Sequence, residues 1–207
     1  MVAPIERTRK FIGSFDALVH VGANDGSEIE DYVASGVKSA ILIEPVPAIF
    51  ERLAERCAAV GYQCVQAVCT ERDGEPVTLH LASNDAQSTS VLRPTGHLSV
   101  HRSISFDTTV PMNGTTLDSL LANIEQIDGR LMLVVDVQGF ELAVLRGAED
   151  TLSRTDAAWL ELSHVDLYQG NALFTEVVQF MDEKGFKLVH LKMNHKMYGD
   201  GLFVRSK

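Results

Sequence analysis

The segment Ala17-Leu-Val-His-Val-Gly-Ala-Asn-Asp-Gly-Ser27 decides the fold that this sequence predicts. Residues 17–21 form an apolar run that Gly22 ends abruptly, which is typical of a buried strand opening into a tight turn. A helix is predicted over residues 28–35, with Ser27 as its N-cap. Strand, turn and helix start together predict a site where the backbone approaches a ligand closely and unsatisfied N–H groups point outward. An ordinary strand-to-helix turn is the alternative.

A second apolar run, residues 39–43, ends in Glu44 and Pro45. Glu44 follows Gly22 by 22 residues. An acidic residue about 20 positions beyond a glycine turn, at the end of the second strand, is where nucleoside-binding α/β folds hold the ribose. A carboxylate suits this task because it accepts two hydrogen bonds from a vicinal diol. The spacing therefore favours a nucleoside site over a solvated charge at a strand end.

Four blocks of sequence resemble the FkbM-type methyltransferase family. They are Val-His-Val-Gly-Ala-Asn-Asp-Gly at 19–26, Ile-Glu-Pro at 43–45, Thr-Leu-Asp-Ser-Leu-Leu at 116–121 and Val-Asp-Val-Gln-Gly-Phe-Glu-Leu-Ala-Val-Leu-Arg-Gly-Ala at 135–148. The resemblance runs from about residue 17 to the end of the chain. Members of this family use S-adenosylmethionine, and many methylate hydroxyls of sugars or other natural-product intermediates.

The resemblance implies a set of cofactor-binding residues. They are Gly22, Ala23, Asn24, Asp25, Gly26, Glu44 and Asp136. Two positions depart from the family pattern: His20 stands where an acidic residue is common, and Gln138 where Glu is common. The first removes an acidic contact, and the second weakens any role of residue 138 as a base or metal ligand.

The order of apolar runs along the chain predicts alternating strands and helices. Helices are expected over 48–60, 116–123, 140–152 with a break near Gly147, and 171–184; strands over 62–68, 77–81, 131–135 and 157–160, and a hairpin from 186–191 and 201–204. This alternation predicts a three-layer, doubly wound, mostly parallel α/β sheet with a C-terminal antiparallel hairpin. Such a fold is Rossmann-like and matches the class I methyltransferase fold that the resemblance implies.

Residues 82–113 differ from the rest, because they are rich in Ser, Thr, Asn and Asp and have little periodicity. A long segment of this kind is usually functional or mobile, so we interpret it as an acceptor-binding lid. A surface excursion without function is the alternative. Within it, Asn84, Ser88 and Ser90 match a polar Asn-x-x-x-Ser region of the family and are predicted to touch the acceptor or the methionine end of the cofactor.

Polar residues follow several of the predicted strands, namely the glycine turn, Glu44, Asp136 and Glu161. Ligands of open α/β sheets bind at these carboxyl ends, where the strand order reverses. We therefore expect Asp136 and Glu161 to face one pocket and to act in catalysis. A hydroxyl needs a base or a metal to become nucleophilic, so one carboxylate would take the proton or both would hold Mg²⁺. His164 is a further candidate base, and an N-cap role is the alternative for Asp136.

Composition limits the partners. The net charge of −10 argues against nucleic acid and favours an uncharged, carbohydrate-like acceptor over a phosphorylated one. Three cysteines without a Cys-x-x-Cys pair indicate a reduced, cytoplasmic setting. No signal peptide or membrane-length apolar run is apparent. Residues 1–207 are expected to form one domain with residues 1–15 as a lead-in, and a homo-oligomer is compatible with the sequence.

The function predicted from these residues is S-adenosylmethionine-dependent O-methylation of a sugar or glycosylated small molecule. A nicotinamide-dependent oxidoreductase is one rival, and the lack of Gly-x-Gly-x-x-Gly counts against it. A nucleoside-binding module without catalysis is another, suggested by His20 and Gln138.

Overall fold

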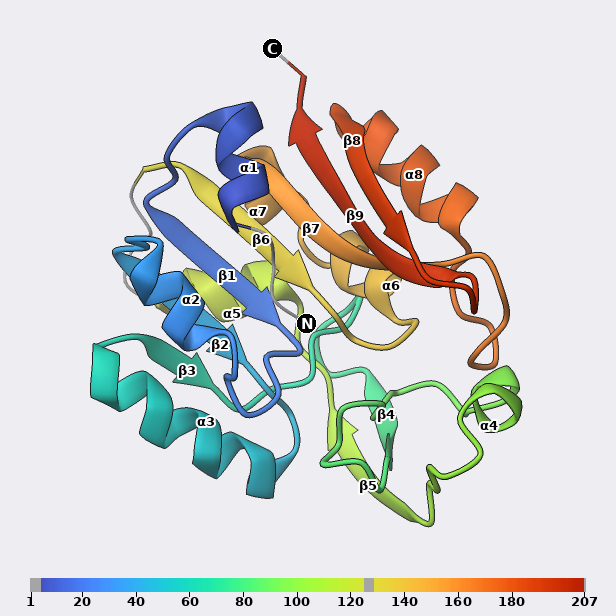
Figure 1. The fold of residues 1–207 in the computed structure, drawn as a ribbon. Helices are drawn as coiled ribbons and strands as arrows, with labels where there is room; N and C mark the ends of the chain where they lie inside the picture. Colours follow the sequence, from blue (N-terminus) through green and yellow to red (C-terminus); the bar gives the residue numbers. More distant parts are fainter. Residues whose placement is uncertain (1–4, 125–128, 207) are drawn as a thin grey trace.

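The computed structural model describes residues 5–124 and 129–206, and it is built on a seven-stranded sheet (Figure 1). The strand order is β3-β2-β1-β6-β7-β9-β8. The strands are β1 (Ala17–Val21), β2 (Ser39–Ile43), β3 (Gln63–Val65), β6 (Leu131–Val135), β7 (Thr155–Ser163), β8 (Phe186–Met193) and β9 (Tyr198–Arg205). The order reverses between β1 and β6, which is the position where ligands bind in such sheets.

The five strands from β3 to β7 run parallel, and β7, β9 and β8 pair antiparallel. The predicted C-terminal hairpin is thereby confirmed, although both strands are longer than expected and the turn between them is shorter. Strands β1 and β6 are buried along their whole length, as expected for a parallel sheet covered on both faces. The predicted doubly wound α/β architecture is confirmed.

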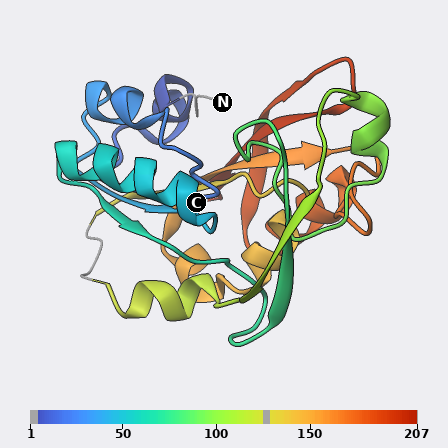
Figure 2. The ribbon, with the colours of Figure 1, turned by 90° about the horizontal axis from the view of Figure 1, so that it is seen from below.

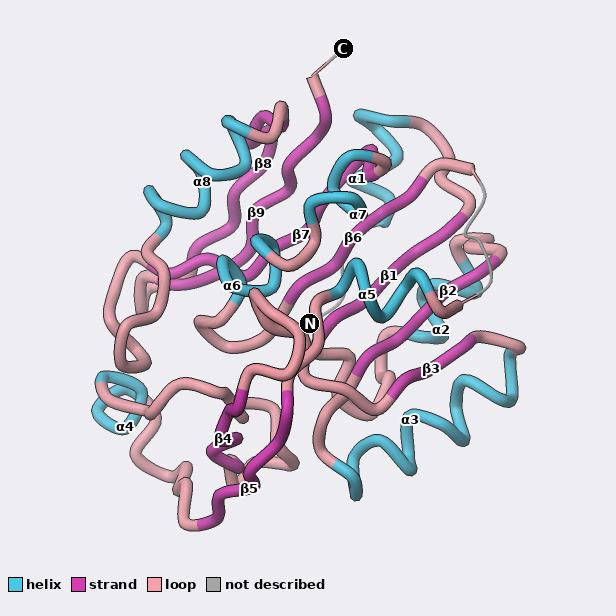
Figure 3. Tube along the Cα trace, turned by 180° about the vertical axis from the view of Figure 1, so that it is seen from behind, coloured by secondary structure: helices cyan, strands magenta, loops and turns pink. Residues whose placement is uncertain are grey.

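Helices cover both faces of the sheet (Figures 1 and 3). One face carries α1 (Ile5–Ile12), α2 (Ile29–Ala34) and α3 (Pro47–Val60); the other carries α5 (Leu117–Ala122), α6 (Glu141–Arg146), α7 (Glu149–Ser153) and α8 (Phe174–Glu183). Each layer has its own apolar core, because alternate residues of β1 point to opposite faces. Leu18 packs with the α2 and α3 layer, and Val19 with the α5 to α8 layer.

The segment predicted to be an irregular lid contains more structure than its sequence indicates. Strand β4 (Pro76–Leu81) pairs antiparallel with β5 (Thr108–Asn113), and α4 (Gly96–Val100) lies between them in sequence. This two-stranded sheet stands apart from the main sheet, at the edge where β1 and β6 end (Figures 1 and 2). The prediction of an unstructured stretch was wrong for 108–113, where Pro111 fits a strand paired on one side only.

The helix after the glycine turn begins differently from the prediction. Glu28, not Ser27, occupies the N-cap of α2, and no side chain caps the helix. Successive backbone turns lead into it, with Gly26 N donating to the Ala23 carbonyl and Ile29 N to the Gly26 carbonyl. The predicted Ser27 cap is therefore wrong, because the backbone itself satisfies these N–H groups. Among the described residues, no helix is long and apolar enough to cross a membrane.

Candidate active site

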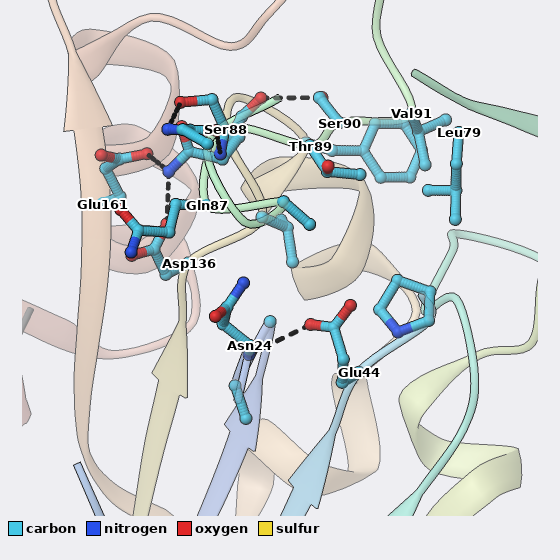
Figure 4. Close-up of a pocket in the computed structure, with 18 of the residues that line it drawn as sticks. Asn24, Glu44, Leu79, Gln87, Ser88, Thr89, Ser90, Val91, Asp136 and Glu161 are labelled. Carbon is cyan, nitrogen blue, oxygen red and sulfur yellow. Dashed lines mark hydrogen bonds between the residues drawn. The ribbon is translucent and has the colours of Figure 1, made fainter. Parts of the chain in front are cut away.

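A cavity of about 370 Å³ opens at the carboxyl ends of the parallel strands. The strand ends form its floor, and loop residues 84–91 close the opposite side (Figure 4). Lining residues from the strand ends are His20, Gly22, Ala23, Asn24, Glu44, Asp136, Gln138 and Glu161. The convergence of polar strand ends that the sequence predicts is thus present in one cavity.

The backbone N–H groups of the glycine turn are already used within the protein. Gly22 N and Ala23 N both donate to the Ile43 carbonyl at 3.0 Å, and Asn24 N donates to the Glu44 carboxylate at 3.0 Å. The expectation of outward-pointing, unsatisfied N–H groups was wrong for these residues, because the turn wraps around the end of β2. A pyrophosphate needs such donors, so this turn is a poor site for a dinucleotide.

Gly22 brings the glycine turn against the end of β6. Its φ is +84°, and a Cβ at this position would lie 1.8 Å from the Asp136 carbonyl oxygen. A side chain is therefore impossible here without moving the backbone. The close contact places Asp136 at the side of the turn, inside the same cavity.

Glu44 is held by backbone donors on both carboxylate oxygens. Oε2 accepts from Asn24 N at 3.0 Å, and Oε1 accepts from Val46 N at 2.9 Å. Burial raises the pKa of this carboxyl to about 7, while the two N–H donors act in the opposite direction. Each oxygen keeps a second lone pair, so the carboxylate is oriented and still able to accept from a ligand diol.

Two residues of the predicted cofactor set do not line the cavity. Asp25 points toward α3, where Arg56 Nη2 donates to its carboxylate at 3.3 Å. Gly26 shapes the turn: a Cβ there would lie 2.7 Å from the side chains of Ile29 and Leu53. Their predicted contacts with a cofactor stay a prediction that this geometry does not support.

Asp136 and Glu161 lie together at the other end of the cavity, joined by the Gln138 amide (Figure 4). Gln138 Nε2 donates to Asp136 Oδ1 at 2.7 Å and to Glu161 Oε2 at 2.9 Å. Burial raises the pKa of both carboxyls, and the Asp136 charge raises that of Glu161 further. Two acids this close titrate as a pair, so the first proton lost belongs to the pair and the second is held more tightly.

A third acid, Glu141, lies beside this pair. One of its oxygens, Oε1, accepts from Val137 N at 3.0 Å and from Gly139 N at 3.1 Å. Glu141 therefore fixes the loop between β6 and α6. The alternative for Asp136, an N-cap role for this helix, was wrong, because Phe140 is the N-cap of α6 and no side chain caps it. Burial is the main cause that raises the pKa of Glu141 to about 7.

Replacing Glu141 with Gln should flatten part of the pH dependence of stability. Because the folded-state pKa of about 7 exceeds the ordinary value of 4.5, the folded protein binds more protons, and stability falls as pH rises from about 4.5 to 7. The amide keeps Oε1 as acceptor and removes the charge, so Glu141→Gln should gain on the order of 1–3 kcal/mol over wild type between pH 5 and 8. Urea unfolding across this range checks it; equal slopes for both proteins would contradict it.

The predicted acceptor residues lie on the loop facing the strand ends. Asn84 Nδ2 donates to Ser88 Oγ at 3.1 Å, and Ser90 Oγ donates to the Gln138 carbonyl at 2.8 Å. Tyr168 Oη lies 2.9 Å from the Ser88 carbonyl and 3.2 Å from Gln138 Oε1. Asn84, Ser88 and Ser90 all line the cavity, so the loop is tied directly to the Asp136–Glu161 end.

His164 lies elsewhere. Its side chain is exposed and does not line the cavity, and its ring packs on Phe174 with 4.4 Å between centroids. Its predicted role as a base stays a prediction that these contacts do not support.

The sequence marks Gln138 and His20 only as departures from the family pattern, and it does not mark Glu28. The position of Gln138, two residues beyond Asp136 and next to a glycine, could have indicated that it lies at the site. His20 and Glu28 are buried in the cavity wall; His20 Nδ1 lies 3.0 Å from Tyr32 Oη, and burial lowers the pKa of His20 to about 4. A neutral imidazole thus occupies the position where the family commonly has an acid.

The fold and the cavity define a class I, Rossmann-like methyltransferase architecture, with its site at the reversal of strand order. The family profile described as methyltransferase FkbM domain matches residues 20–188, and the chain belongs to this family.

One curated relative is 2-O-methyltransferase NoeI from Sinorhizobium fredii, which is 26% identical over an alignment of 200 residues; the alignment covers 92% of this chain and 79% of that protein. Methyltransferase FkbM from Methylobacillus flagellatus has a similar structure, with a TM-score of 0.56 and 12% identity over 91% of this chain and 43% of that one. Sp1610 of Streptococcus pneumoniae, a putative tRNA (m1A22) methyltransferase solved with S-adenosyl-L-methionine, has a similar structure with a TM-score of 0.50. The identity is 16%, and the match covers 100% of this chain and 75% of that one. These two structures support the fold alone.

Proposed function

We propose that the chain is an S-adenosylmethionine-dependent methyltransferase that acts on a hydroxyl of an uncharged acceptor such as a sugar or a glycosylated small molecule. The observation that carries the proposal is one cavity with Glu44 at one end and the Asp136–Glu161 pair at the other, joined by the glycine turn (Figure 4). Glu44 is suited to bind a ribose, and the Asp136–Glu161 pair is suited to accept a proton.

Glu44 would hold the ribose of the cofactor through its remaining lone pairs. The occupied N–H groups of Gly22 and Ala23 favour a cofactor without phosphate over a nicotinamide dinucleotide. S-Adenosylmethionine contains no phosphate, so this argument separates the proposal from the oxidoreductase rival. When bound, it would supply an activated methyl group on a sulfonium.

The residues of this chain would then position the acceptor hydroxyl and take its proton. Alignment of the two reacting groups can contribute about 7–11 kcal/mol. Asp136 is the proposed base, since it lines the cavity next to the glycine turn and Gln138 holds its carboxylate in place. Burial raises the pKa of the Asp136 carboxyl, and a carboxylate of higher pKa is a better proton acceptor than an ordinary one.

A divalent cation is the alternative means of activating the hydroxyl. Asp136, Glu141 and Glu161 offer oxygens that all lie within 4.8 Å of one another. Their oxygens, however, face N–H donors: Gln138 Nε2 donates to two of these carboxylates, and backbone N–H groups donate to the third. This arrangement does not fit a cation held between Asp136 and Glu161, because the Gln138 amide donates to both carboxylates from that position. No step proposed here uses Mg²⁺.

The charge of the cavity favours an uncharged acceptor. Its described lining includes Glu28, Glu44, Asp136 and Glu161 but no Lys or Arg. Phosphorylated acceptors and nucleic acid would be repelled, which agrees with the net charge of −10. The name of the relative NoeI, a 2-O-methyltransferase, supports transfer to a hydroxyl. A cytoplasmic location is part of the proposal and rests on the cysteine content alone.

A methyl-release assay tests the function. With S-adenosylmethionine and a panel of methyl glycosides, we expect S-adenosylhomocysteine to form with at least one glycoside and the rate to be unchanged by EDTA. Abolition by EDTA and recovery with Mg²⁺ would restore the metal alternative. Binding of the cofactor without turnover on any hydroxyl acceptor would favour the binding-module rival, and binding of a nicotinamide cofactor instead would favour the oxidoreductase.

A further inference from the structure

Aromatic residues wall the cavity at its Asp136–Glu161 end. His97 comes from α4, His101 follows that helix, and Tyr198 begins β9; all three line the cavity. The two imidazole rings stack with 4.7 Å between centroids, and His101 Nε2 lies 3.1 Å from Tyr198 Oη. Tyr198 faces Ser163 across the strand pair, two residues beyond Glu161 and on the same side of β7. We call His97, His101 and Tyr198 the aromatic wall.

The aromatic wall is fixed to the body of the protein. Thr95 N and His97 N both donate to the Leu167 carbonyl, at 3.0 and 2.9 Å. A Cβ on Gly96 would lie 2.3 Å from the Asp166 carbonyl oxygen, so α4 rests directly on the loop after β7. The wall is therefore a formed surface that lines the cavity without any movement of the loop.

His97 is the polar group in this wall that lacks a partner. Its side chain is only 3% exposed and is enclosed by rings, with Phe106 at 5.3 Å and Tyr168 at 5.4 Å between centroids. Nδ1 is buried and makes no hydrogen bond to any residue in 5–124 or 129–206. A buried polar group without a partner costs about 1–3 kcal/mol, so its retention calls for an explanation.

The charge state of His97 limits what it would bind. Burial, with His101 and Lys196 nearby, lowers the pKa of His97 to about 4, so the ring is neutral at physiological pH. A neutral imidazole carries one N–H donor and one acceptor nitrogen, which matches a hydroxyl. The neighbouring rings offer apolar faces with polar edges, and Ile104 and Leu167 add apolar lining.

Resting on the function proposed above, we propose that the aromatic wall is the acceptor subsite, where His97 hydrogen-bonds a hydroxyl of an uncharged sugar ring that packs against His101 and Tyr198. The subsite adjoins Glu161, because Tyr198 pairs with Ser163 two residues further along β7 and the Glu161 charge acts on the Tyr198 hydroxyl. Figure 4 shows Glu161 and Glu44 at opposite ends of the cavity. The subsite therefore leaves the proposed ribose site free and presents the sugar beside the Asp136–Glu161 pair. His97 is a specificity-determining residue in this arrangement, not the base.

The test is the variant His97→Phe, which keeps ring packing against Phe106 and Tyr168 but removes both nitrogens. Saturation-transfer NMR with the panel of methyl glycosides, in the presence of S-adenosylhomocysteine, should show a glycoside that binds wild type and binds the variant on the order of 10-fold more weakly. Calorimetry should give the same S-adenosylhomocysteine affinity for both proteins. His195→Phe, on the exposed turn before β9, is the matched control and should bind like wild type.

Each outcome decides a separate point. Equal glycoside binding by wild type and His97→Phe would overturn the subsite, as would loss of binding in His195→Phe to the same extent. A second variant, His97→Gln, retains a donor and an acceptor and should recover part of the glycoside affinity. If it recovers none, and the melting temperature of His97→Phe is also below that of wild type, the His97 ring is structural and the subsite is overturned. Absence of S-adenosylhomocysteine binding by wild type would refute the proposed function itself.

Discussion

Replacing Glu44 with Ala should weaken S-adenosylmethionine binding about 10²–10⁴-fold, because two hydrogen bonds from a diol to a charged acceptor contribute about 1.5–3 kcal/mol each. The same change also leaves Asn24 N and Val46 N without acceptors, so the glycine turn loses its anchor. Isothermal titration calorimetry measures the affinity. Glu44→Gln keeps the side-chain length and one acceptor oxygen, and it should lose less affinity than the alanine variant.

The matched control for Glu44 is Asp25→Ala. Asp25 lies in the same turn and carries the same charge, but it faces Arg56 on α3 and does not line the cavity. Its cofactor affinity should stay within about twofold of wild type, since exposed ion pairs contribute about 0–1 kcal/mol. Loss of affinity in Asp25→Ala, with wild-type affinity in a folded Glu44→Ala, would place the cofactor outside the proposed site.

Protonation of Glu44 gives this prediction a pH dependence. Its folded-state pKa of about 7 lies above the ordinary 4.5, so the carboxylate form that accepts two hydroxyl donors gains population as pH rises through 7. Cofactor affinity should therefore increase from pH 6 to pH 8 in wild type. The increase should be absent from Glu44→Gln, which has no proton to lose.

The parts of the fold that the sequence predicted best are strands buried on both faces. The predicted bounds of residues 17–21, 39–43 and 131–135 agree with β1, β2 and β6 residue for residue. Largely apolar runs of five residues that a glycine or an acid ends are typical of strands buried in a parallel sheet. The ends of these strands were well placed, and with them Glu44 and Asp136. The strand predicted over 157–160 was too short: β7 extends to Ser163, so Glu161 lies within it and not at its end.

Features that depend on contacts distant in sequence were predicted least well. Strand β5 is a polar, half-exposed segment with a proline, and only its pairing with β4 makes it a strand. Gln138 gains its importance from a hydrogen bond to Glu161, 23 residues further along the chain. The aromatic wall joins His101 to Tyr198, which are 97 residues apart, so no local spacing would reveal it.

Replacing Asp136 with Asn should lower kcat by about 10²–10⁴-fold, the usual contribution of a general base. The amide keeps an oxygen that accepts from Gln138 Nε2, so the geometry at the end of β6 is retained while proton uptake is lost. Cofactor affinity measured by calorimetry should change little, which separates loss of chemistry from loss of binding. Glu161→Gln should also lower kcat, because it removes the partner with which Asp136 shares a proton.

The double variant of Asp136 and Glu161 distinguishes a pair from two independent acids. If the two carboxyls act as one unit, the double variant should be little slower than Asp136→Asn alone, since groups that act together have non-additive effects. Asp200→Asn is the matched control: Asp200 is a buried acid opposite Glu161 in the strand pair, but it does not line the cavity. Full kcat in Asp136→Asn would contradict the role of Asp136 as base. A large loss of kcat in a His164→Ala variant that melts like wild type would then favour His164 instead.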